Sequence, residues 1–175
     1  SEINIQVSII QSFLTRLSLL RENLQTDNFD KNQVFRNYTY LNDHIMRLIK
    51  LLPTQSESAK ISNYIAAYYH FLLAKEFAGQ ERALLYSVFA DDRIPQQTRL
   101  RLVNIISEQK TYYRLFEEYV SNLQPNLSLE ILQGRVFNEV KRLRQTALNR
   151  PSNFNIVADN WFALASERMT LLKEK

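Results

Sequence analysis

A short run of charged residues stands in the middle of an otherwise apolar stretch of this sequence. Residues 64–74 are almost wholly apolar, and residues 83–90 are apolar apart from Ser87. Between them lie Lys75, Glu76, Glu81 and Arg82. So apolar a stretch predicts a helix buried on most faces, where charges are costly unless they are paired, hydrogen-bonded or given a ligand. A polar site is therefore expected at this run.

Helical spacing gathers part of the run on one face. Residues three or four apart share a face of a helix, which groups Lys75, Gly79, Arg82 and Tyr86. A glycine inside a helix costs about 1 kcal/mol relative to alanine, so Gly79 predicts that another helix or a ligand approaches the backbone there. Two interpretations stay open. One is an internal ion network of the charged residues, and the other is a ligand site at the glycine that the two cations flank.

Patterns typical of enzymes and metal sites are weak. Pairs of glutamates, such as Glu117 with Glu118 or Glu130 with Glu139, are common on the solvated faces of helical proteins, so no acid–base enzyme is predicted. The sequence has no Cys, which removes thiolate nucleophiles and Cys zinc sites. His44 and His70 lack partners in a ligand pattern and are interpreted as structural or surface residues. No cofactor or metal is expected.

A basic segment at residues 141–144 contains Lys141, Arg142 and Arg144. On a helix these residues divide between faces and lack the context of a recognition helix, so no nucleic-acid partner is predicted. Arg144 lies beside an apolar stripe and is the member expected to point inward, which adds it to the candidate site residues.

The composition indicates a helical protein. Two Gly and four Pro among 175 residues are far below the roughly 12% of average usage, which excludes turn-rich β-sandwiches and phosphate-loop enzymes. With 45% hydrophobic and 23% charged residues, the chain can bury one core and is not a disordered tail. The net charge of +4 mildly favours anionic partners.

Apolar residues at alternating spacings of three and four predict six helices. They are expected at about 3–24, 34–52, 59–90, 102–123, 132–147 and 159–172, with Gly134 interrupting the fifth early. Short connections predict an all-α, antiparallel bundle of about six helices, forming a single domain over residues 1–175. Because uncapped helices reach both ends, we expect the sequence to be a fragment of a longer protein.

The charged run belongs to a longer motif. Residues 74–83 read A-K-E-F-A-G-Q-E-R-A, and this block resembles the A-K-E-x-x-G-x-E-R-A signature of the bacterial nitrate- and nitrite-sensing domain family. Shorter pieces at 38–42, 109–112, 140–144 and 161–168 are similar to that family's Y-T-x-L-N, Q-x-x-Y, V-x-x-x-R and W-F-x-x-x-x-x-R segments. The resemblance covers most of the chain, from about Leu17 to Leu172.

The resemblance implies an all-helical sensor without catalytic activity, related to two four-helix bundles that share long helices. Such domains look like input modules that bind nitrate or nitrite between helices through arginines. Arg82 matches the arginine of the family's G-x-E-R block and is the leading ligand-binding residue. The family's other arginine lies in a Q-x-E-R-G motif that this sequence does not contain. Either that helix lies outside the sequence or this member has lost half of the site.

We therefore expect a sensor domain that detects nitrate or nitrite and passes a conformational signal to an output domain. Nitrate is a planar monoanion, and the planar guanidinium of arginine suits it better than a lysine ammonium does. The candidate ligand-binding residues are Lys75, Gly79, Glu81, Arg82, Tyr86 and Arg144. The alternative is a helical protein-interaction or dimerisation module whose buried ion network is purely structural.

Assembly and location follow as expectations from the same reasoning. The apolar stripe from Ile3 to Leu17 suits a dimer seam or a core face, and a homodimer is expected. No stretch approaches 18 uninterrupted apolar residues, so no membrane contact is expected within this sequence. The family implies the periplasmic or extracytoplasmic part of an inner-membrane receptor, with the cytoplasm as the alternative.

Overall fold

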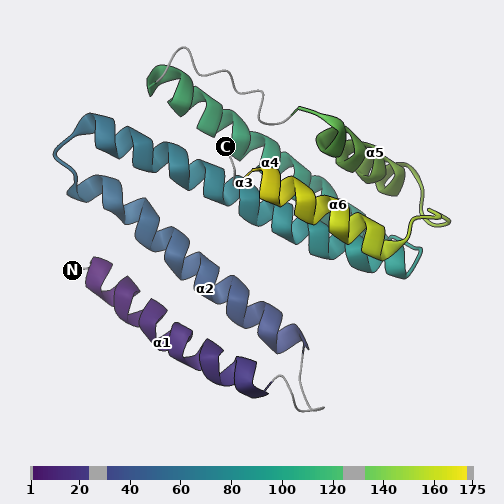
Figure 1. Cartoon of the computed structure of the whole chain (residues 1–175), viewed down its shortest axis with the longest axis horizontal. Helices are drawn as coiled ribbons and strands as arrows, with labels where there is room; N and C mark the ends of the chain where they lie inside the picture. The colour runs from purple at the N-terminus through teal and green to yellow at the C-terminus, as the bar shows by residue number, and fades with distance from the viewer. Residues whose placement is uncertain (1, 24–30, 124–132, 173–175) are drawn as a thin grey trace. The chain divides into compact units, whose positions relative to one another are not determined.

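The computed structural model describes residues 2–23, 31–123 and 133–172, and these ranges are mostly helical. Within them lie six α-helices and one short 3-10 helix: α1 (Glu2–Asn23), α2 (Lys31–Leu51), η1 (Leu52–Gln55), α3 (Ala59–Ala90), α4 (Gln96–Leu123), α5 (Arg135–Asn149) and α6 (Ala158–Leu171). The predicted all-α class is confirmed (Figure 1). The chain divides into two compact units, residues 1–69 and 70–175.

The first unit contains a helical hairpin. Helices α1 and α2 pack against each other with opposite directions, as Figure 1 shows. The buried side chains of Gln6 and His44 join them, with 2.7 Å between Gln6 Oε1 and His44 Nδ1. The ring of Tyr40 lies 4.4 Å from that of His44. His44 therefore has the structural role predicted for it. Helix α2 ends at Leu51, because Pro53 cannot continue a helix and sits in the first turn of η1 instead.

The second unit builds one apolar core from the later part of α3 and from α4, α5 and α6. Its buried members include Leu85, Leu102, Val140, Trp161 and Ala165. The Trp161 and Phe89 rings meet edge to face at 5.7 Å, a favoured geometry for aromatic pairs. Each helix contributes residues spaced three or four apart, as the apolar stripes predict. Buried residues Val136, Val140, Leu143 and Ala147 of α5 show this spacing in full.

Two loops of the second unit are joined by backbone hydrogen bonds. The turn after α3 meets the segment between α5 and α6, where Ile94 N donates to Pro151 O at 2.9 Å. Asp92 Oδ1 accepts a 2.7 Å hydrogen bond from Phe154 N. Asp92 and Asn153 both have positive φ angles, +46° and +58°, which aspartate and asparagine tolerate better than most residues do. These polar residues therefore fix the connection that carries α6 back onto α3.

The start of α5 differs from the prediction. The fifth helix was expected to include Leu132, which lies outside the described residues, and to continue through Gly134. Instead Gly134 has a φ of +115° and precedes the first helical residue, Arg135. That backbone angle is outside the helical region and favours glycine. Gly134 therefore precedes the helix rather than interrupting it.

Candidate functional site

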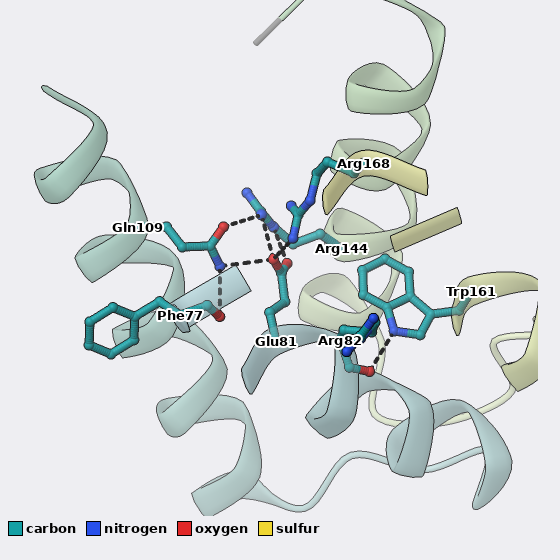
Figure 2. Close-up of polar contacts among 7 residues, drawn as sticks. All are labelled: Phe77, Glu81, Arg82, Gln109, Arg144, Trp161 and Arg168. Carbon is teal, nitrogen blue, oxygen red and sulfur yellow. Dashed lines mark hydrogen bonds and ion pairs between the residues drawn. The ribbon is translucent and has the colours of Figure 1, made fainter. Parts of the chain in front are cut away.

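A fully buried carboxylate lies at the centre of the second unit. Glu81 has 0% exposure in the middle of α3. Arg144 of α5 binds it through both arms of its guanidinium, with Nε 2.5 Å from Oε1 and Nη2 2.8 Å from Oε2. Figure 2 shows this pair facing each other across the helix interface. Bidentate pairs of this kind are among the strongest polar contacts in proteins.

Two further side chains complete the cluster around Glu81. Arg168 of α6 donates from Nη2 to Oε2 at 3.1 Å, and Gln109 of α4 donates from Nε2 to the same oxygen at 2.9 Å. Gln109 Oε1 also accepts from Arg144 Nη2 at 3.4 Å. Four helices thus meet on one carboxylate (Figure 2). We call Glu81, Gln109, Arg144 and Arg168 the Glu81 cluster.

The protonation state of Glu81 follows from these contacts. Burial would raise the pKa of its carboxyl group, but the hydrogen bond from Arg144 and the charges of Arg168 and Arg144 outweigh burial. The pKa therefore lies below its ordinary value, and Glu81 is ionised near neutral pH. One carboxylate then faces two guanidiniums. The cluster carries one positive charge in excess.

Arg82, the next residue along α3, does not pair with Glu81. Successive residues point about 100° apart around a helix, so the side chains face different neighbours. Arg82 Nη1 donates to Ser166 Oγ at 2.9 Å, and the guanidinium lies 4.6 Å over the Phe162 ring. The Arg82 carbonyl accepts a 2.9 Å hydrogen bond from Trp161 Nε1 (Figure 2). Burial, with help from the charge of Arg168, lowers the pKa of Arg82.

This arrangement corrects the predicted ion network. One of the two interpretations placed Glu81 and Arg82 in an ion network within the charged run, whereas the Glu81 carboxylate pairs with Arg144 and Arg168 from other helices. Local spacing favours ion pairs within one helix. The packing of α5 and α6 against the buried face of α3 instead brings partners from distant parts of the sequence to Glu81. The expectation that Arg144 points inward is met by its contact with Glu81.

The other candidate residues on α3 lie at separate places. Tyr86 meets the Phe162 ring edge to face at 5.8 Å, so it shares this neighbour with Arg82. The Lys75 ammonium lies 5.5 Å from the Phe71 ring centroid on its own helix. At Gly79, an added Cβ would be 3.8 Å from Met169 Cε, an ordinary van der Waals contact. The sequence predicted that either another helix or a ligand approaches the Gly79 backbone. Helix α6 does so.

A cavity lies beside the Glu81 cluster. It has a volume of about 740 Å³ and is lined by residues of α4 and α5 together with Arg168. Gln109, Tyr113 and Arg144 are among its walls, whereas Gly79 and Arg82 are not. A sensor site built on Gly79 and Arg82 would place a cavity beside those two residues. This cavity instead opens beside the arginines that bind Glu81.

Sequence reasoning missed three contributors to this region. Gln109 and Arg168 entered only as parts of shorter motifs, and Ser166 did not enter at all. A signal existed for Arg168, because it follows buried Trp161 and Ala165 at helical spacing. Gln109 likewise follows buried Leu102 and Ile105 on the inner face of α4. A polar residue placed on an apolar stripe is a candidate member of a buried polar cluster.

Comparison with known proteins identifies the family of this chain. The family model for nitrate and nitrite sensing matches residues 1–174. This chain belongs to the nitrate and nitrite sensing family. The resemblance carried by residues 74–83 is thereby confirmed.

One relative of this sensing domain is the nitrate regulatory protein of Klebsiella oxytoca. The two are 26% identical over 163 residues, which is 92% of this chain and 41% of the relative. The chain therefore spans less than half of that protein. No solved structure matches the sensing domain.

Two findings limit what the described part of the sensing domain contains. In residues 2–23, 31–123 and 133–172 there is no group of three or more His, Cys, Asp or Glu side chains placed to hold a metal ion. Within the same ranges, no helix has the length and apolar character needed to span a membrane.

Proposed function

We propose that this domain binds nitrate or nitrite beside Arg82 and signals its presence to an output domain. The observation that carries the proposal is an excess of buried positive charge. Arg144 and Arg168 both bind one carboxylate, that of Glu81, and the charge of Arg168 also acts on Arg82. Arg144 and Arg168 share that carboxylate, while the contacts of Arg82 with the described residues are a hydroxyl, an aromatic ring and the charge of Arg168. Among the described residues, Arg82 is thus a half-buried cation without a carboxylate partner.

The surroundings of Arg82 suit a small planar oxyanion. Its Nη1 holds Ser166 Oγ, which leaves the remaining N–H groups of the fork without a hydrogen-bond partner among the described residues. Nitrate and nitrite are planar, weakly hydrated monoanions, and parallel N–H groups match two of their oxygens. The Phe162 ring covers one face of the guanidinium, which lowers local solvation and strengthens a charge pair. We include Lys75, Gly79 and Tyr86 as neighbours of the anion on the same side of α3.

A route for the signal follows from the contacts of Arg82. Its side chain and its carbonyl both bind α6, through Ser166 and Trp161. An anion that engages the guanidinium would alter the balance between arrangements of α3 and α6, since a ligand shifts a population by its difference in affinity for the two states. The regulatory title of the Klebsiella oxytoca relative suits such an input role. Pairing of two copies and an extracytoplasmic location are part of this proposal.

Thermal unfolding in a panel of anions tests the proposal. Nitrate, nitrite, chloride and sulfate are compared at matched ionic strength. At a hundredfold excess over its Kd, a ligand adds about 2.7 kcal/mol to the unfolding free energy. We expect nitrate or nitrite to raise the Tm of the wild type and to leave that of Arg82→Gln unchanged. Exposed Arg101 offers a matched control, and Arg101→Gln should keep the shift. Equal shifts in the wild type and Arg82→Gln would rule out Arg82 as the anion ligand.

A second candidate function is supported by the Glu81 cluster itself. Its carboxylate already receives hydrogen bonds from three side chains, as a purely structural network would. A helical protein-interaction or dimerisation module would show this cluster without any anion response. Absence of a Tm shift with every anion in the panel would favour that function over sensing.

A further inference from the structure

The cavity of about 740 Å³ between α4 and α5 is strongly biased in charge. Five basic side chains line it, namely Lys110, Arg114, Lys141, Arg144 and Arg168, against the one acidic side chain of Glu117. The nearby carboxylate of Glu81 is already shared by two of these arginines. The positive charge on the cavity wall is therefore only partly neutralised by the described residues.

One buried donor of a residue in this wall lacks a hydrogen-bond partner in the described part of the chain. The Nε of Arg168 is buried without a hydrogen bond, although the residue is only 5% exposed. Arg144 uses Nε and Nη2 on Glu81 and Gln109, and its hydrogen bonds to the described residues do not involve Nη1. Buried donors are nearly always satisfied in folded proteins. The described residues therefore supply no acceptor for the Arg168 Nε.

Apolar side chains also line the cavity. They include Ile106 of α4 and Phe137 and Val140 of α5. Pockets of roughly 300–1,000 Å³ that place apolar side chains beside a few polar groups are typical sites for small organic molecules. Nitrate, with four heavy atoms, would occupy a small part of this volume and leave the apolar walls wet.

We propose that this cavity binds an organic monocarboxylate with an apolar body, at a site separate from Arg82. The carboxylate would lie near Arg144 and Arg168, and the body against Ile106, Phe137 and Val140. Glu81 shows that these two guanidiniums accept a planar carboxylate. The charge matches as well, because one further anion would neutralise the excess charge of the Glu81 cluster.

Tyr113 adds a donor to the same wall. Burial raises the pKa of its hydroxyl to about 12. The group is therefore protonated at neutral pH and can donate a hydrogen bond to a carboxylate. Lys141 and Lys110 add further cationic groups to the walls.

Calorimetric titration with formate, benzoate and 2-naphthoate tests this proposal. All three carry the same carboxylate, while the apolar body grows along the series. We expect 2-naphthoate to bind at least about tenfold more tightly than formate, because the cavity removes the additional apolar surface of the larger acid from water. Equal affinities for the three acids, or no binding of 2-naphthoate at millimolar concentration, would overturn the proposal.

Substitution of Gln145 locates the site. This residue lines the cavity and is exposed, so Gln145→Glu adds a negative charge without disturbing the core. We expect it to weaken 2-naphthoate binding at least about tenfold, from repulsion at close range. Gln97→Glu is the matched control, because Gln97 is exposed and lies on α4 about 14 Å along the helix axis from Ile106.

The two proposed sites can be tested independently of each other. Arg82→Gln should abolish the nitrate response and leave 2-naphthoate binding intact, whereas Gln145→Glu should do the reverse. Naphthoate binding that survives in Gln145→Glu but is lost in Arg82→Gln would place the carboxylate at Arg82 and overturn the second site. Naphthoate binding without any nitrate response would support the second site and contradict the proposed sensing function.

Discussion

Glu81 and Arg144 lie 63 residues apart in the sequence and form a bidentate ion pair in the core, with N–O distances of 2.5 and 2.8 Å. The pair joins α3 to α5, and Arg168 extends it to α6. Burying charges costs several kcal/mol per ion, and removing one partner of a buried pair leaves the other charge without compensation. Much of the stability of the second unit should therefore depend on the Glu81 carboxylate.

Removing that charge should destabilise the domain strongly. Glu81→Gln keeps the size of the side chain but leaves two buried guanidiniums without a counter-charge, which typically costs about 3–5 kcal/mol. Urea unfolding measures the change in the free energy of unfolding. Glu139→Gln is the matched control, because the ion pair of Glu139 with Arg142 is exposed and should contribute little. Similar losses in the two variants would contradict a central role for the buried cluster.

The lowered pKa of Glu81 predicts a loss of stability in acid. Between the folded and unfolded pKa values the unfolded chain binds more protons, so stability falls as the pH falls through this interval. The stabilisation is fully present above the unfolded pKa of about 4.3. We expect the free energy of unfolding to decrease below about pH 4 in the wild type and to decrease less in Glu81→Gln. Since the pKa of Glu139 is lowered too, the comparison is best made on a Glu139→Gln background.

Trp161 should report on anion binding at Arg82. It is the single tryptophan of the sequence, has 0% exposure, and donates to the Arg82 carbonyl. Its emission should lie at short wavelength and shift when nitrate engages the neighbouring guanidinium. The wavelength of the maximum is the observable, because nitrate and nitrite absorb light and reduce intensity. An identical shift in Arg82→Gln would show that the signal does not come from the proposed site.

Alanine substitutions at the two glycines should have opposite effects on the stability of the protein. Gly79 lies within α3, and a Cβ there meets Met169 Cε at 3.8 Å, so Gly79→Ala should stabilise by about 0.5–1 kcal/mol. At Gly134 an added Cβ would meet no atom of the described residues within 4 Å, but the φ is +115°, so Gly134→Ala should destabilise by about 1–2 kcal/mol.

Denaturant titration of both variants measures these changes. Loss of the nitrate response in a stabilised Gly79→Ala would place the anion against that backbone. Destabilisation of Gly79→Ala would instead mean that α6 cannot accommodate the added methyl group.

The sequence by itself determined the helices and the position of the polar site along the chain. The third helix was predicted at 59–90 and is observed at Ala59–Ala90, because apolar spacing and local breakers act within a few residues of each other. The charged run of α3 likewise predicted a buried polar site, since charges within an apolar helix require partners. The family resemblance rested on the same local residues.

The tertiary structure alone decided which partners these charges have. Glu81 binds Arg144 and Arg168, which lie 63 and 87 residues away, rather than adjacent Arg82. Helical periodicity fixes the face on which a residue lies but not the helix that covers that face. For the same reason the cavity formed beside Arg144 and not beside Gly79, because its walls come from α4 and α5, whose packing depends on the whole core.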